Sequence, residues 1–197
     1  MKFTVLILFL VLINSSLFSQ ENQSYQTFKN YKQTIEIKGM GGPMIDFSGT
    51  VDAFTFLWGG GAAVSINKNI YLGGFGYSAF NGLNPDGFTK QEDYENYFEY
   101  GGVWAGYVFS PNKVIHPVFD IKAGWGNLAI ENLNTGITNN FSTYIIKPSF
   151  EIEMNINKFM KIGLDVHYRH VGEVEIEKFT YDFSGTGLGF SFKFGWF

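Results

Sequence analysis

The sequence predicts an all-β fold, an eight-stranded antiparallel up-and-down transmembrane β-barrel. Three observations lead to it: an apolar export signal opens the chain, apolar and polar residues alternate along most of the rest, and short polar turns alternate with long polar connections. Aromatic residues make up 19% of the 197 residues, and 24 residues are glycine. This pairing favours β structure in which backbones approach closely.

The composition excludes several classes of function. With a formal net charge of −4, the chain has no excess of Lys and Arg to neutralise a phosphate backbone, so no nucleic-acid partner is expected. The chain contains no Cys, which excludes disulfides, thiolate metal sites and a lipoprotein anchor. No cofactor is expected.

The first residues have the pattern of a secretory signal peptide. Lys2 precedes an apolar stretch over 3–13, and Ser19 offers a small residue for cleavage. The apolar stretch is far shorter than the roughly 20 residues of a transmembrane helix. We therefore expect a signal peptide at 1–19, an N-terminal periplasmic segment at 20–32 and an outer-membrane β-barrel at 33–197.

A repeat marks the short turns between strands. Asn-Lys pairs recur at Asn67-Lys68, Asn112-Lys113 and Asn157-Lys158, with equal steps of 45 residues. Each pair interrupts aromatic and β-branched stretches, as hairpin turns do. Longer polar connections are expected at 81–96, 131–140 and 179–185. The strands that fit between these breaks are 33–46, 53–66, 70–80, 96–110, 114–128, 142–155, 159–176 and 186–197.

Within most strands, apolar and polar side chains alternate, so each strand has one apolar and one polar face. The pattern is clearest in 159–176, and 142–155 and 114–128 repeat it. The glycine-rich strands 53–66 and 96–110 show no clean phase. Their glycines are expected to let a narrow sheet bend and to make room for bulky neighbours.

Alternation alone does not separate a membrane barrel from a soluble one, whose apolar face is inside. The export signal, the asymmetry between short turns and long loops, and aromatic residues near strand ends favour the membrane. A periplasmic ligand-binding barrel stays an alternative. The residues expected to form aromatic girdles at the membrane interfaces are Tyr71, Tyr77, Tyr107, Phe109, Trp125 and Tyr168.

The last strand, 186–197, carries alternate aromatic residues up to the end of the sequence. With this strand the chain resembles the small eight-stranded outer-membrane barrels of Gram-negative bacteria, the β-barrel domain group with OmpX-like and PorT-like members. The resemblance implies insertion into outer-membrane lipid and recognition of the last strand by the barrel-assembly machinery. This assembly signal would comprise Phe190, Phe192, Phe194, Trp196 and Phe197, although Phe197 lies on the opposite parity from the other aromatic residues.

An eight-stranded barrel is only wide enough to be filled by its own side chains. We therefore expect the inward polar faces to form an ionic plug, in which acids and bases neutralise one another, and not a water channel. A proton or ion path is the alternative. The expected interior residues are Glu36, Lys38, Asp120, Lys122, Lys147, Glu151, Glu153, Lys161, Asp165, His167, Arg169 and Lys193.

The histidines do not predict a catalytic or metal site. His167 and His170 are three apart and point to opposite faces of a strand. Asp165 shares a face with His167, but without a nearby Ser nucleophile an ion pair is the better interpretation. Barrel enzymes that deacylate lipid A keep a His and a Ser two residues apart, and here Gly172 follows His170. We therefore expect no enzymatic activity, and a lipid-modifying barrel enzyme is the alternative.

The alternation of the seventh strand continues past His170, beyond the roughly ten residues that cross a membrane. Its far part is expected to project as a β-ribbon and to form an acidic rim with the 81–96 loop. A cationic surface of an extracellular or envelope protein, or divalent ions bridging to lipid phosphates, would complement such a rim, and a solvated acidic loop without a partner is the alternative. The chain would then act as a structural or binding component through its outer loops. The rim would comprise Asp86, Glu92, Asp93, Glu95, Glu173, Glu175 and Glu177.

Overall fold

The computed structural model describes residues 35–49, 54–79, 94–132, 134–176, 179–181 and 183–197. The expected signal peptide and the 20–32 segment lie outside these residues, as do Asp86, Glu92, Asp93 and Glu177 of the acidic rim. The strands are β1 (Ile37–Gly49), β2 (Phe54–Ile66), β3 (Ile70–Ala79), β4 (Tyr94–Val108), β5 (Ile115–Asn132), β6 (Ile137–Asn155), β7 (Met160–Val171), β8 (Val174–Ile176), β9 (Phe179–Tyr181) and β10 (Gly185–Gly195). No helix among the described residues is long and apolar enough to span a membrane.

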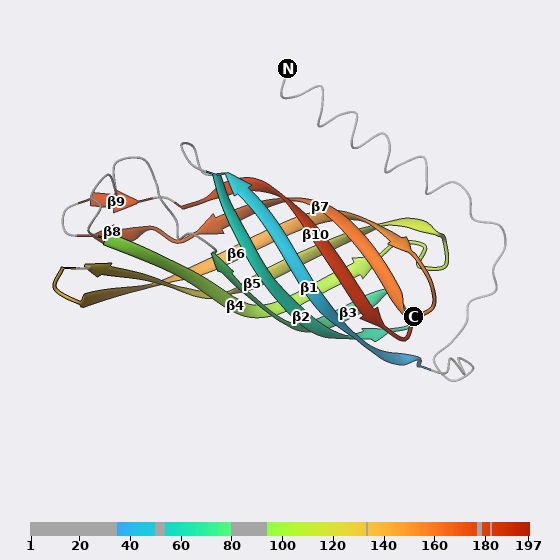
Figure 1. Ribbon diagram of the computed structural model, residues 1–197. Coiled ribbons are helices and arrows are strands. Elements are labelled where there is room, and N and C mark those ends of the chain that lie inside the picture. The colour runs from blue at the N-terminus through green and yellow to red at the C-terminus, as the bar shows by residue number, and fades with distance from the viewer. Residues whose placement is uncertain (1–34, 50–53, 80–93, 133, 177–178, 182) are drawn as a thin grey trace, which may run out of the picture. The chain divides into compact units, whose positions relative to one another are not determined.

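Eight of the strands close into a barrel in the order β1-β10-β7-β6-β5-β4-β3-β2 (Figure 1). Every neighbouring pair is antiparallel, and β10 closes the barrel against β1. The predicted fold class is confirmed. The strands β8 and β9 form a separate two-stranded sheet.

The three Asn-Lys pairs lie in the short connections β2–β3, β4–β5 and β6–β7. In the first, Asn67 and Lys68 have φ of 51° and 64°, the positive pair that a type I′ hairpin turn needs and that Asn tolerates well. We call the end of the barrel that carries these three connections the turn end, and the opposite end the loop end.

The loop end departs from the sequence prediction in two places. The expected long loop at 131–140 is a short turn, because β5 and β6 stay paired from Ile115↔Met154 to Asn132↔Ile137. The Asn and Thr residues of this segment suggested a loop. The part of the β5–β6 pairing that extends beyond the membrane can, however, carry polar side chains on both faces. The seventh strand ends at Val171, and the expected ribbon is the separate β8–β9 hairpin.

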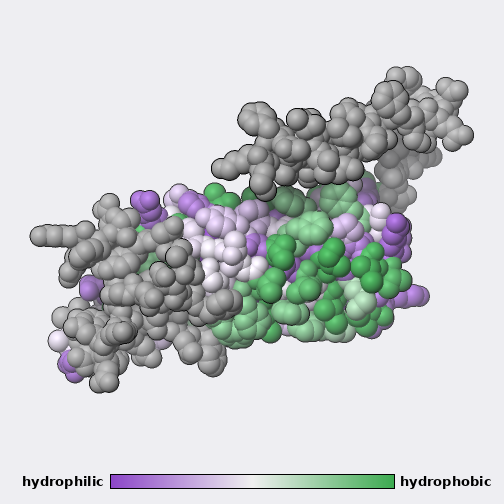
Figure 2. All heavy atoms as spheres, turned by 90° about the horizontal axis from the view of Figure 1, so that it is seen from above, coloured by the Kyte–Doolittle hydropathy of each residue, from purple (hydrophilic) through white to green (hydrophobic). Residues whose placement is uncertain are grey.

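The apolar faces of the strands point outward. Trp125 is 74% exposed and Trp196 69%, and Phe119, Val103 and Val166 are exposed on the same wall. Figure 2 shows hydrophobic side chains gathered over the barrel wall, with hydrophilic ones at the right-hand end. This arrangement is the inverse of the one that a soluble barrel with an apolar cavity requires.

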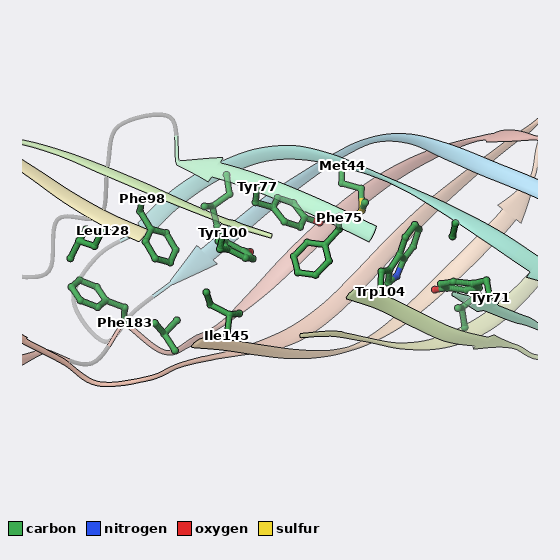
Figure 3. Close-up of a cluster of buried hydrophobic side chains, with 14 of the residues drawn as sticks. Met44, Tyr71, Phe75, Tyr77, Phe98, Tyr100, Trp104, Leu128, Ile145 and Phe183 are labelled. Atoms are coloured by element: carbon green, nitrogen blue, oxygen red, sulfur yellow. Dashed lines mark hydrogen bonds between the residues drawn. The ribbon is translucent and has the colours of Figure 1, made fainter. Parts of the chain in front are cut away.

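Two residues expected in the aromatic girdles lie inside the barrel. Tyr71 and Tyr77 are 1% and 4% exposed, whereas Tyr107, Phe109, Trp125 and Tyr168 are exposed (Figure 3). The reason is the cross-strand register, which places Gly106 beside Tyr71 and Gly59 beside Tyr77. A Cβ on either glycine would overlap the tyrosine ring, so glycine on one strand makes room for a ring on the next.

Candidate functional site

The interior of the barrel holds a balanced set of charged groups. Among the described residues, five carboxylates, five basic side chains and two imidazoles are buried. With neutral histidines the charges cancel, as burial in a low-dielectric interior requires. The set comprises Asp46, His116, Asp120, Lys122, Lys147, Glu151, Glu153, Lys161, Asp165, His167, Arg169 and Lys193.

Two members of this set are absent from the interior residues expected from the sequence. The odd or even position of each residue in its strand was enough to predict its inward face. Asp46 has the same parity as Lys38, but it is the last residue of the expected strand, and β1 runs on to Gly49. His116 has the same parity as Asp120 and lies near the start of β5. Both residues lie within the expected strands 33–46 and 114–128, so the period of two assigned them to the inward face, and they were omitted although that rule covered them.

Near the turn end, the Glu153 carboxylate lies within hydrogen-bond distance of three basic side chains. Its Oε1 lies 2.7 Å from Lys161 Nζ and 2.9 Å from His116 Nε2, and its Oε2 lies 2.7 Å from Lys193 Nζ. Lys193 also donates to Glu151 Oε2 at 2.6 Å. Strands β5, β6, β7 and β10 are thus joined through one carboxylate.

A second network lies deeper in the barrel. Lys147 donates to Asp46, and Asp165 Oδ1 lies 2.7 Å from His167 Nδ1. His167 Nε2 lies 3.8 Å from Asp46 Oδ2. Ligand atoms of Asp46, Asp165 and His167 lie within 4.8 Å of one another, the spacing of a possible metal site. The Lys147 ammonium already contacts this group, so the chain supplies a compensating cation itself.

Each of the five buried basic groups also faces an aromatic ring. Lys193 Nζ lies 5.5 Å from the centroid of the Trp104 ring and 5.7 Å from the centroid of the Tyr71 ring. The remaining pairs are Lys122–Trp104 at 5.1 Å, Lys147–Tyr77 at 4.7 Å, Lys161–Phe197 at 4.3 Å and Arg169–Phe98 at 6.0 Å. The basic groups come from β5, β6, β7 and β10, whereas all the rings except Phe197 come from β3 and β4. Cation–π attraction therefore couples the ionic half of the interior to the aromatic half.

Toward the loop end, a cluster of apolar side chains packs beside the buried Arg169. Phe98, Leu128, Ile145 and Phe183 are buried there and lie near one another (Figure 3). Val174, the first residue of β8, belongs to the same buried cluster. The chain that follows β7 therefore folds partly over the barrel interior.

Glu36 and Lys38 do not join the buried set, which corrects their expected interior position. Their side chains are 45% and 24% exposed, and they pair with each other at 2.7 Å. The hydrogen bond from Lys38 lowers the pKa of the Glu36 carboxyl. They lie at the very start of the β1 ladder, where Ile37 pairs with Ile66, so water reaches an inward side chain.

The residues of the expected assembly signal lie on two sides of the wall. Phe190, Phe194 and Trp196 are exposed on the outside, and Phe192 is partly exposed. Phe197 is partly buried, with the Lys161 ammonium over its ring. Among the described side chains, only Glu173 of the expected acidic rim can be placed, and it is exposed. The side chains of Glu95 and Glu175 lie outside the described set.

A Ser–His contact forms at the loop end that the sequence did not suggest. Ser184 Oγ lies 3.5 Å from His170 Nδ1, and His170 Nε2 lies 3.2 Å from the Tyr144 hydroxyl. Ser184 is buried, and its hydroxyl accepts a hydrogen bond from Val171 N and donates one to Val171 O. The serine thus bridges the backbone N–H and C=O of the last residue of β7. It lies 14 positions after His170 in the sequence, so no short sequence motif shows the contact.

An eight-stranded antiparallel barrel with an apolar wall and an ionic core has the fold of the small outer-membrane barrels. Similar solved structures are the Neisserial surface protein A (NspA; TM-score 0.55, 10% identity, 83% of this chain and 97% of that one) and the N-terminal barrel of Pseudomonas aeruginosa OprF (0.53, 11%, 81% and 97%). The attachment invasion locus protein Ail of Yersinia pestis is a third (0.50, 13%, 81% and 96%). No protein-family model and no curated protein matches the sequence.

Proposed function

We propose that the chain is an exported outer-membrane barrel that is closed to ions and acts as a structural or binding component through its loop end. The observation that carries this proposal is the inversion of faces, with charges inside and exposed apolar side chains outside. A wall of that kind is stable only when an apolar phase covers it. Export through a cleaved signal peptide and recognition by the barrel-assembly machinery belong to the same proposal.

The filled interior supports closure. The five carboxylates and five basic groups bond to one another or face rings, and the aromatic cluster of Phe98 and Phe183 follows them toward the loop end. An ion entering this interior would have to break buried ion pairs, which costs about 3–5 kcal/mol for each pair broken. Purified protein in a planar bilayer should therefore give no large unitary currents, and stable large currents would refute closure.

The charge at the loop end supports a cationic partner. Glu173 is exposed just beyond the end of β7, and Glu99 is exposed on the half of β4 nearer the loop end. The connections outside the described residues add further acids in the sequence. The structural neighbour Ail has been solved with sucrose octasulfate, a heparin analogue. An acidic loop end would repel such a sulfated ligand and would suit a basic protein surface or divalent ions bridging to lipid phosphates.

Fractionation of cell envelopes tests the location. The protein should sediment with outer membranes and should change its gel mobility only after boiling, as closed barrels do. Recovery of the processed chain in the soluble periplasmic fraction would refute the proposal.

A further inference from the structure

The Asn-Lys repeat does two different things at the turn end. The asparagines build the turns: Asn67 Oδ1 accepts a hydrogen bond from Glu36 N at 3.0 Å, and Asn157 Oδ1 accepts one from Phe159 N at 2.7 Å. The lysines are not needed for that. No described carboxylate forms an ion pair with Lys68 or Lys158, so their ammonium groups are available to a ligand.

These two lysines line a cavity in the mouth of the barrel. The cavity has a volume of about 330 Å³, which is within the range of small-molecule sites. Lys38 and Lys161 contribute two more ammonium groups to its wall. Tyr71, Trp196 and Phe197 supply an aromatic wall. Lys113, the third lysine of the repeat, is exposed and is not among the residues that line the cavity.

The charge of this turn-end cavity is positive. Glu153 also lines it, but its two oxygens already bond Lys161, Lys193 and His116. Glu36 neutralises Lys38. Lys68 also acts on the Glu36 carboxyl through its charge, but one carboxylate balances only one of the two ammonium groups near it. Lys158 forms no ion pair with a described carboxylate, so the wall keeps an excess of positive charge although the whole chain is acidic. A positive pocket in an acidic protein, placed where every turn of one motif converges, indicates a ligand of opposite charge.

We propose that the turn-end cavity binds a phosphate-bearing ligand, with Lys68 and Lys158 on the phosphate and the Tyr71–Trp196–Phe197 wall on an apolar or aromatic body. Lysine ammonium groups hold phosphate as point charges through charge-assisted hydrogen bonds. The wall favours an organic phosphate over bare inorganic phosphate, because only a ligand with an apolar body covers the exposed Trp196 ring and the partly exposed Phe197 ring. The site is at the opposite end from the loop-end surface and does not depend on any partner there.

Phenyl phosphate is a suitable probe, since it combines the two chemistries. The mature protein is folded in an uncharged maltoside detergent and titrated calorimetrically at low ionic strength. We expect one saturable site, weakened by added sodium chloride because salt screens exposed charges. Phenol and inorganic phosphate should each bind at least about tenfold more weakly than phenyl phosphate, since each lacks one half of the recognition.

The repeat itself offers the matched control. The double variant Lys68→Gln/Lys158→Gln should lose about tenfold or more in affinity, whereas Lys113→Gln should change it by less than about twofold, since only the first two lysines reach the cavity. A heat-modifiability gel of each variant establishes that it has folded. Equal losses in both variants would mean unspecific attraction to surface lysines and would overturn the site.

A second titration distinguishes two sources of the phosphate. Dihexanoyl phosphatidylglycerol presents a lipid headgroup, and dihexanoyl phosphatidylcholine is its zwitterionic control. Preference for phosphatidylglycerol over phenyl phosphate would assign the cavity to an anionic lipid headgroup, and the reverse preference would assign it to a soluble phosphate ester. If neither probe binds saturably, the proposal is wrong.

Discussion

Lys147 on β6 donates a hydrogen bond to Asp46 on β1 across the barrel interior. The two residues are 101 positions apart in the sequence, and β10 and β7 lie between their strands in the barrel wall. Neither residue is exposed to water. Their charges must therefore be compensated within the barrel, and this contact links the first strand to the ionic half of the interior. A buried ion pair adds little net stability compared with a well-packed apolar pair, but removing one of its partners is costly.

Removing one partner of this pair should be costly. Lys147→Met leaves the Asp46 carboxylate buried without its cation, and we expect it to lower the free energy of unfolding by about 3–5 kcal/mol. The double variant Asp46→Asn/Lys147→Met removes both charges and should recover most of that loss. Urea unfolding of the barrel in lipid vesicles measures both. A double variant as unstable as the single one would show that the ion pair is not the cause.

Gly106 should tolerate no side chain. A Cβ there would overlap the ring of Tyr71, which is held by the Trp104 ring at a centroid distance of 4.9 Å. We expect Gly106→Ala to destabilise the barrel by about 1–3 kcal/mol, the usual cost of overpacking. Gly39→Ala is the control, because nothing lies within 4 Å of a Cβ at that position. Equal effects of the two substitutions would exclude the steric explanation.

Ser184 should matter for stability and not for lipid chemistry. Ser184→Ala removes the hydroxyl that bridges the N–H and C=O of Val171, and leaving these groups unpaired should cost about 1–3 kcal/mol. Mass spectrometry of envelope lipids should show no difference between cells with the native chain and cells with the variant. A serine-dependent loss of an acyl chain would instead support the lipid-modifying enzyme, with His170 as its base.

Outward and inward aromatic residues of the last strand should affect different steps. Phe194 is exposed on the wall, where assembly factors can reach it, so Phe194→Ala should lower the amount of barrel in the outer membrane. Phe197 contacts the Lys161 ammonium, and Phe197→Ala should cost about 1 kcal/mol of unfolding free energy with little effect on assembly. Quantitative immunoblots and urea unfolding separate the two effects.

Parity along strands predicted most of the ionic interior, because a side chain's face in a strand depends only on its position in the sequence. Asp165, His167 and Arg169 follow from that period of two and are buried. Tyr71 and Tyr77 could not be assigned in the same way, since an aromatic ring suits either face. The register that places Gly106 and Gly59 beside them decides the question, and register joins residues that are far apart in the sequence.

Ends of elements were the second limit of the sequence prediction. The β5–β6 ladder continues through polar residues that suggested a loop, and β1 runs on to Gly49, past the expected end at 46. Contacts such as Lys147–Asp46 and Ser184–His170 depend on the closed barrel and have no local signature. The period of two in the sequence was enough to predict the fold class. The side-chain networks could not be predicted, because they depend on which strands the closed barrel brings together.

The β8–β9 hairpin is the segment whose removal tests binding at the loop end. Val174 and Phe183 are buried in the apolar cluster, so a shortened variant must keep both. Replacing 175–181 by Asn-Gly shortens the hairpin and leaves both residues in place. We expect the shortened barrel to keep its heat-modifiable mobility, since β8 and β9 pair only with each other and lie outside the closed ladder. It should lose binding to a basic protein surface, measured with immobilised polylysine at low ionic strength.

A control that keeps the hairpin but changes Glu175 and Glu177 to Gln distinguishes charge from shape. If the shortened barrel fails to fold, or if it folds and binds polylysine as the full chain does, the hairpin is not the binding element.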